Sequence, residues 1–227
     1  MPNPPPGSVR VLLERIEACL ADRDNILGHG YQGYTYRLCV DGRHLAVKAP
    51  LGSGLTAWVS RWMLYNEYRV YRRLEGMAGI PVCYGFLGRR YLVLECIEGI
   101  PLRSAEISDP DYFFRTLLER IRRMHHRGIA HGDLKKKDNI LVVNGREPWL
   151  IDFGVAAVRK DRLAPLNHYR FRLFQRFDYN AWVKLKLHRV GALSAAEQDF
   201  YRRTMVESAA GWIKQTWKKG KRFLKSR

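Results

Sequence analysis

The chain has 227 residues, of which 46% are hydrophobic and 12% aromatic, so it can bury a globular core and is not expected to be disordered. Its four cysteines form no C-x-x-C pair and have no histidine at ligand spacing, which argues against a zinc site and a disulfide framework. The sequence shows no signal peptide and no apolar run of membrane-spanning length. We therefore expect a soluble, cytoplasmic protein.

The formal net charge of +18 is concentrated in the last third of the chain. Residues 1–158 hold 22 Lys and Arg against 17 Asp and Glu, whereas residues 159–227 hold 18 against 5. Such a surplus predicts an anionic partner, which could be nucleic acid, phospholipid or a phosphorylated glycolipid.

The spacing of apolar residues and turn residues predicts alternating strands and helices after a Pro-rich start at 1–8 that we expect to be disordered. A helix is expected at 9–20, strands at 25–27, 35–40 and 44–49, a helix at 57–74, strands at 82–86 and 91–96, a helix at 111–127, and short apolar segments at 140–143 and 149–151.

Residues 28–33 (GHGYQG) join two expected strands of a hairpin. Gly28, Gly30 and Gly33 have no Cβ, so their backbone N–H groups could approach phosphate oxygens closely. A glycine-rich turn without a ligand is at least as common, so the motif is weak evidence when taken alone. Its position between two strands distinguishes it from a dinucleotide-binding motif, which joins a strand to a helix.

Lys48 ends the next expected strand, where its ammonium group could hold the α- and β-phosphates of a nucleotide. Such a lysine needs a carboxylate to fix it. Glu67 lies on the inward-facing side of the following helix, where an unpaired carboxylate would be costly. The two residues explain each other, although each could also be a surface residue at the edge of its element.

The sequence HGDLK at residues 131–135 follows the long helix and precedes an apolar strand. In phosphoryl transfer to a hydroxyl, an aspartate orients the nucleophile and accepts its proton, and a nearby cation steadies the transferred group. Asp133 and Lys135 suit these two roles. The amide oxygen of Asn139 suits Mg²⁺.

Asp152 follows a buried strand and precedes Phe153 and Gly154. A carboxylate in this place could be the main Mg²⁺ ligand and bridge the β- and γ-phosphate oxygens. An Asp-Phe-Gly triplet alone arises easily by chance. Its place after the glycine loop, the strand lysine, the helix glutamate and the aspartate loop makes coincidence improbable.

In this order the motifs at residues 28–154 resemble those of the protein-kinase superfamily. The resemblance implies a bilobal α+β fold that binds ATP and Mg²⁺ between its lobes. An N-lobe at 9–95 would hold an antiparallel sheet and one helix, and a minimal helical C-lobe would follow at 96–207. The backbone of the connecting hinge, including Glu95 and Ile97, would bind the adenine ring.

The sequence departs from the usual protein-kinase pattern, and the departures limit which kinases it resembles. Gly132 stands where regulated protein kinases usually have arginine, and only 73 residues follow Gly154, which suggests a minimal atypical kinase. The usual spacing from aspartate to asparagine is also one residue shorter, so Asp138 remains an alternative to Asn139 as the second metal ligand.

Three functions follow from these features. Residues 177–186 (FDYNAWVKLK) are similar to the closing part of the bacterial lipopolysaccharide core kinases, which implies transfer to a sugar hydroxyl of lipopolysaccharide core or a related glycolipid. The alternative is a small atypical protein Ser/Thr kinase, similar to the RIO or the tRNA-modification-associated kinases. A pseudokinase scaffold is the third, although the residues needed for catalysis are all present.

Residues 208–227 are expected to form a basic amphipathic helix with Trp212 and Trp217 on its apolar face. Such a helix could anchor the protein at the inner face of the cytoplasmic membrane, pack on the C-lobe, or bind nucleic acid. The sequence does not distinguish these alternatives.

Overall fold

The computed structural model describes residues 9–21, 26–30 and 33–198. The expected disordered start at 1–8 and the expected basic helix at 208–227 lie outside the described residues. Within the described ranges, no helix is long and apolar enough to cross a membrane.

The first part of the chain forms a five-stranded antiparallel sheet with the order β1-β2-β3-β5-β4. Its strands are β1 (Ile26–Gly30), β2 (Gly33–Val40), β3 (Arg43–Pro50), β4 (Cys83–Leu87) and β5 (Tyr91–Glu95). The Asp41-Gly42 turn joins β2 to β3, and both of its residues have positive φ, as a tight hairpin with right-handed twist requires.

The two faces of this sheet face two different hydrophobic cores, because side chains alternate along each strand. Tyr91 and Val93 of β5 pack with Leu12 and Ile16 of α1 (Val9–Ala21). Leu92 and Leu94 belong instead to the core that extends into the second half of the chain.

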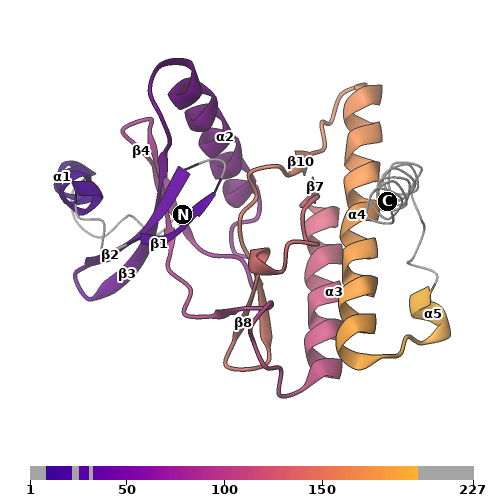
Figure 1. Ribbon diagram of the computed structural model, residues 1–227. Helices are drawn as coiled ribbons and strands as arrows, with labels where there is room; N and C mark the ends of the chain where they lie inside the picture. The colour runs from indigo at the N-terminus through magenta and orange to yellow at the C-terminus, as the bar shows by residue number, and fades with distance from the viewer. Residues whose placement is uncertain (1–8, 22–25, 31–32, 199–227) are drawn as a thin grey trace, which may run out of the picture.

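Helix α2 (Gly54–Arg73) covers the face of the sheet opposite α1 (Figure 1). Its inner residues Val70 and Tyr71, with Leu74 just after it, are buried in the same core as Phe113 and Phe114 from the second half of the chain. The helix therefore joins the sheet to the helical lobe.

Two long helices, α3 (Pro110–His126) and α4 (Pro165–Val190), lie side by side in the second half of the chain (Figure 1). Asp109 caps α3, its carboxylate accepting the N–H of Tyr112. The indole Nε1 of Trp182, which is fully buried in α4, donates to the carbonyl of Phe114 in α3 at 2.8 Å. The short helix α5 (Ala195–Gln198) follows.

Two small sheets of short strands position the loops that lie between the helical lobe and the five-stranded sheet. They are β6 (Ile100–Pro101), β8 (Ile140–Val143) and β9 (Glu147–Leu150) in one sheet, and β7 (Ile129–Ala130) with β10 (Ala157–Val158) in another. The first sheet flanks a 3-10 turn at Lys137–Asn139, and the second brings the start of the 131–135 loop close to the segment after Asp152.

Helix α4 was not among the elements expected from the sequence. Its apolar residues are spread around the helix, because one side packs on α3 and other positions contact the 131–135 loop, so no single apolar stripe marks it.

Candidate active site

Three residues distant in the sequence meet where the sheet faces the helical lobe. The ammonium of Lys48 in β3 lies 2.7 Å from Oε1 of Glu67 in α2 and 3.1 Å from Oδ1 of Asp152 after β9. Glu67 is fully buried, and its Oε1 also accepts the backbone N–H of Phe153 at 3.1 Å. The glutamate thus fixes both the lysine and the segment that carries Asp152.

Charge pairing sets the protonation of this cluster. Burial opposes the charge on Lys48, but Glu67 and Asp152 outweigh it and hold the pKa of Lys48 above its ordinary value. Lys48 in turn holds the pKa of Asp152 below its ordinary value against the effect of burial. Burial raises the pKa of Glu67, and Lys48 counteracts that rise. An ammonium facing two carboxylates is the consistent state.

Asp133 is half-buried in the loop that follows β7, and Asn139 is buried beside it. The Nδ2 group of Asn139 donates to the backbone carbonyl of Asp133 at 3.1 Å and approaches its Oδ2 at 3.4 Å. The Asp138 carboxylate pairs with the guanidinium of Arg103 instead. Asn139 thus contacts Asp133, whereas Asp138 is held by Arg103. This geometry favours Asn139 over Asp138 as the candidate for the second metal ligand.

The lysines of the loop differ in their positions. The side chain of Lys135 is exposed and makes no ion pair with a described residue. The ammonium of Lys136 is 3.8 Å from Oδ2 of Asp152. The structure therefore brings Lys136 closer to the cluster than Lys135, which the sequence had assigned to the phosphoryl group.

A buried aspartate from α4 supports the loop at residues 131–135, which we call the catalytic loop after its predicted role. The Asp178 carboxylate accepts the backbone N–H groups of His131 and Gly132, each at 2.8 Å, and Nε2–H of His125 at 2.9 Å. These donors satisfy a fully buried carboxylate and fix the backbone immediately before Asp133.

Aromatic rings connect the loop to α2. Phe153 packs edge-on against Tyr71 at 5.1 Å between ring centres and lies 4.8 Å from the ring of His131. Nε2 of His131 donates to the carbonyl of Ile151 at 3.0 Å, while Nδ1 accepts the N–H of Asp133 at 3.4 Å. The loop, the Asp-Phe-Gly segment and α2 therefore form one packed unit.

Gly132 has to be glycine for a steric reason. Its φ is +80°, and a Cβ at this position would lie 2.3 Å from the ring of Phe174 in α4. The ring occupies the space that a side chain at position 132 would need.

The predicted phosphate and adenine contacts lie at the sheet. Gly28 and Gly30 are in β1, and Gly33 starts β2, where a Cβ would meet the carbonyl oxygen of Ala49 at 1.8 Å. Glu95 ends β5.

The hinge residues Glu95 and Ile97 differ in which of their groups form hydrogen bonds. The Glu95 side chain accepts the N–H of Val82 at 3.0 Å, and the Ile97 carbonyl accepts the N–H of Gly99 at 3.0 Å. Among the described residues, the N–H of Ile97 is not used in a hydrogen bond, so this donor suits a ring nitrogen of adenine.

The donor set fits Mg²⁺ bound together with a nucleotide. Asp152 offers a carboxylate, and Asn139 keeps its amide oxygen after Nδ2 has bonded Asp133. No group of three or more His, Cys, Asp or Glu residues in the described part of the chain forms a metal site by itself. Mg²⁺ typically takes one or two protein ligands and completes its shell with phosphates and water, so two oxygens suffice.

Sequence reasoning missed the supporting residues. His125, Phe174 and Asp178 carry no motif of their own, and their roles depend on the packing of α4 against the loop. One signal was present: an aspartate between apolar and aromatic residues at 177–183 is costly to bury unless it has partners.

Comparison with known proteins agrees with this geometry. The family model for the protein kinase domain matches residues 22–170. The EKC/KEOPS complex subunit BUD32 of Encephalitozoon cuniculi is 29% identical over 157 residues, covering 64% of this chain and 76% of the relative. The probable serine/threonine-protein kinase FPV226 of fowlpox virus is 24% identical over 156 residues, covering 59% of this chain and 53% of the relative.

Solved structures show the same fold. The Rio2 kinase of Chaetomium thermophilum, both by itself and in its ADP/Mg²⁺-phosphoaspartate complex, superposes with a TM-score of 0.60 at 17% identity, covering 82% of this chain. The chain spans about half the length of the fowlpox relative and just under two thirds of the Rio2 chains.

This chain belongs to the protein kinase domain family. The predicted bilobal α+β fold with a small helical lobe is confirmed. The more specific resemblance to lipopolysaccharide core kinases is not: the comparisons favour the atypical protein kinases, which the sequence had offered as the alternative.

Proposed function

We propose that this protein is a small atypical protein kinase that transfers the γ-phosphoryl group of ATP to a serine or threonine hydroxyl of a protein. The observation that carries the proposal is the convergence of Lys48, Glu67 and Asp152 within hydrogen-bonding distance, opposite an Asp133 that is positioned by Asn139. The acceptor class rests on the relatives, whose names include a serine/threonine-protein kinase.

Each residue has a defined task in this reaction. Lys48, held by Glu67, binds the α- and β-phosphates, and the carboxylate of Asp133 orients the acceptor hydroxyl and takes its proton. Asp152 and Asn139 would hold Mg²⁺, which, when bound, neutralises charge on the phosphates. Lys136, which lies 3.8 Å from Asp152, is placed to steady the transferred group.

A glycolipid hydroxyl is the second acceptor class, since residues 177–186 resemble part of the lipopolysaccharide core kinases. In the fold this segment lies within α4, and most of its members are buried against α3 and the catalytic loop. Its pattern is thus explained by packing in the helical lobe, which weakens it as evidence for a particular acceptor.

The test is incubation of the full chain with labelled ATP and Mg²⁺ and four acceptors in parallel: the chain itself, a generic protein such as casein, lipopolysaccharide, and tRNA. We expect label in protein, lowered at least ~100-fold by Asp133→Asn. Asp161→Asn is the matched control, because Asp161 is exposed and distant in sequence from the loop. It should retain full labelling.

The other outcomes are equally informative. Label confined to lipopolysaccharide would overturn the protein-kinase assignment in favour of the glycolipid acceptor. Absence of ATP turnover with every acceptor, in a chain that still binds Mg²⁺–ATP, would favour a pseudokinase scaffold.

A further inference from the structure

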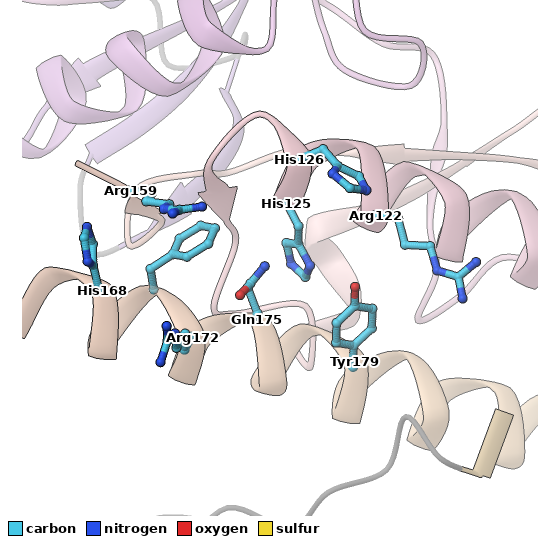
Figure 2. A pocket seen from close by; sticks show the side chains of 9 residues that line it. Arg122, His125, His126, Arg159, His168, Arg172, Gln175 and Tyr179 are labelled. Atoms are coloured by element: carbon cyan, nitrogen blue, oxygen red, sulfur yellow. The ribbon is translucent and has the colours of Figure 1, made fainter. Parts of the chain in front are cut away.

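A second, strongly cationic cavity lies in the helical lobe between α3 and α4, apart from the Lys48 cluster (Figure 2). Its volume is about 310 Å³. The lining has no carboxylate and includes three arginines and three histidines: Arg122, His125, His126, Arg159, His168 and Arg172. We call this cavity the α3–α4 pocket.

The walls of the pocket are fixed by hydrogen bonds. The N–H of Arg159 donates to the carbonyl of Gly128 at 2.8 Å, and the carbonyl of Arg159 accepts Nη1 of Arg73 at 3.4 Å. Nε2–H of His168 donates to the carbonyl of Lys160 at 2.9 Å. The segment after β10 is thereby attached to both α4 and the end of α3, so the cations are held around a preformed cavity.

Two of the three arginines of the pocket, Arg159 and Arg172, are not neutralised by any residue that the structure describes. Neither Arg159 nor Arg172 has a carboxylate within ion-pair distance among the described residues, and both side chains belong to exposed residues. Their guanidinium groups are therefore available to an anion. Arginine is the side chain best suited to bind phosphate, because its planar donors match two phosphate oxygens at once.

An unsatisfied polar atom points to a ligand. The His125 side chain is only 4% exposed, and its Nε2 bonds Asp178, but its Nδ1 is buried without a hydrogen-bond partner. The hydrogen bond to Asp178 holds the ring, which packs edge-on against Tyr179 at 5.0 Å and Phe171 at 6.5 Å between ring centres. A buried polar atom left unpaired is destabilising, and a hydrogen bond to a ligand atom would remove this cost.

We propose that the α3–α4 pocket binds a small phosphorylated molecule, its phosphate held by Arg159 and Arg172 and hydrogen-bonded to Nδ1 of His125. The volume lies near the lower end of small-molecule pockets and suits a phosphate ester of one small ring better than an extended chain. The aromatic rings of Phe171 and Tyr179 provide an apolar wall for the ring.

Many kinases carry a phosphorylated residue in the segment after Asp-Phe-Gly. This chain has no residue there that could provide such a phosphate. Residues 152–164 contain no serine, threonine or tyrosine, so this segment cannot supply a phosphate to the pocket. The proposed phosphate therefore does not come from this segment.

Hydrogen bonds of two side chains connect the pocket to the catalytic loop. His125 lines the pocket and bonds Asp178, and Asp178 accepts the N–H groups of His131 and Gly132. A phosphate bound to Nδ1 would fix the position of the His125 ring and thereby its hydrogen bond to Asp178. We therefore expect the ligand to slow hydrogen exchange at residues 131–133.

The test uses the full chain with its ATP site filled by Mg²⁺ and a non-hydrolysable ATP analogue, and calorimetric titration with phenyl phosphate. We expect saturable binding that Arg159→Ala and Arg172→Ala each weaken by roughly tenfold, as loss of one charge-assisted contact does. Arg176→Ala is the matched control, since Arg176 is exposed on the same helix but does not line the pocket. Phenyl sulfate, with a single charge, should bind more weakly.

Two results would overturn the proposal. One is the absence of saturable binding by phenyl phosphate, including the case in which a short RNA binds tightly and depends on Arg159 and Arg172, which would assign the cations to nucleic acid. The other is an equal loss of affinity in Arg176→Ala, which would indicate general charge attraction. Protection of residues 131–133 by phenyl phosphate, lost in Arg172→Ala, would support the connection to the loop. This readout does not depend on kinase activity.

Discussion

Gly132 illustrates how one atom decides which residue a position accepts. Its φ of +80° disfavours any Cβ, and the Phe174 ring occupies the place of that Cβ. Gly132→Ala should therefore lower the free energy of unfolding by about 2–4 kcal/mol, from backbone strain and overpacking together. Urea denaturation would measure it.

Gly42 provides the control for that substitution. Its φ is +74°, but a Cβ there would meet no atom within 4 Å, so Gly42→Ala should cost only the backbone part, about 1–2 kcal/mol. Adding Phe174→Ala to Gly132→Ala should reduce the further penalty of the alanine. If the two glycine variants lost equal stability, the ring would not be the cause.

The depressed pKa of Asp152 predicts a specific sensitivity to acid. A carboxyl whose pKa is lower in the folded than in the unfolded state stabilises the fold above its ordinary pKa, and this contribution is lost as the pH falls through the folded-state value. The stabilisation should thus be complete at neutral pH and decline below roughly pH 4.

Asp152→Asn should reduce this loss, and asparagine tolerates the φ of 65° at this position. The measurement is the change in Tm between pH 6 and pH 3, which should be smaller in Asp152→Asn than in the wild type. Asp161→Asn, with an exposed carboxyl, should behave like the wild type. Identical acid shifts in all three proteins would exclude a stabilising Lys48–Asp152 pair.

At the scale of elements, helix α4 supports the catalytic loop through Asp178. Asp178→Asn replaces one of the acceptor oxygens by an NH₂ group that would face the donors of His131, Gly132 or His125. We expect a loss of about 3 kcal/mol in the free energy of unfolding, since one buried donor becomes unpaired and a buried charge is removed. Urea denaturation with Asp161→Asn as the control would measure this loss. A decrease of less than about 1 kcal/mol in the free energy of unfolding would contradict the supporting role of Asp178.

The elements that carry motifs could be predicted from the sequence, and the helix that supports them could not. Lys48, Asp133 and Asp152 lie in or beside glycines, turns and short strands whose local chemistry limits their conformation, and Glu67 lies on the buried face of α2. Helix α4 has Pro165 at its start and Gly191 after its end, but no apolar stripe between them, because its residues are selected by contacts with α3 and with the loop. The cationic pocket was also beyond prediction, since its arginines come from three segments that meet only in the fold.

At the scale of the whole molecule, the two hydrophobic cores predict that α1 stabilises one face of the sheet only. Leu12 is 1% exposed, and Leu12→Ala should cost about 2–4 kcal/mol. Hydrogen exchange should accelerate in β2 and β3, which share that core, and stay unchanged in α3. Val11→Ala, at an exposed position of the same helix, should change neither. Equal loss of protection in α3 would mean that the cores unfold together.

The burial of α2 in the core of the helical lobe has a consequence for how activity can be controlled. An outward swing of this helix would expose Val70, Tyr71 and Leu74 to water, at about 1.5–3 kcal/mol for each side chain, and would separate Glu67 from Lys48. Conformational switches need two states of nearly equal free energy, and this packing makes one state far more stable than the other. Lys48 is therefore expected to stay paired with Glu67, and the activity of the proposed kinase would be set by the supply of its acceptor and not by displacement of a helix.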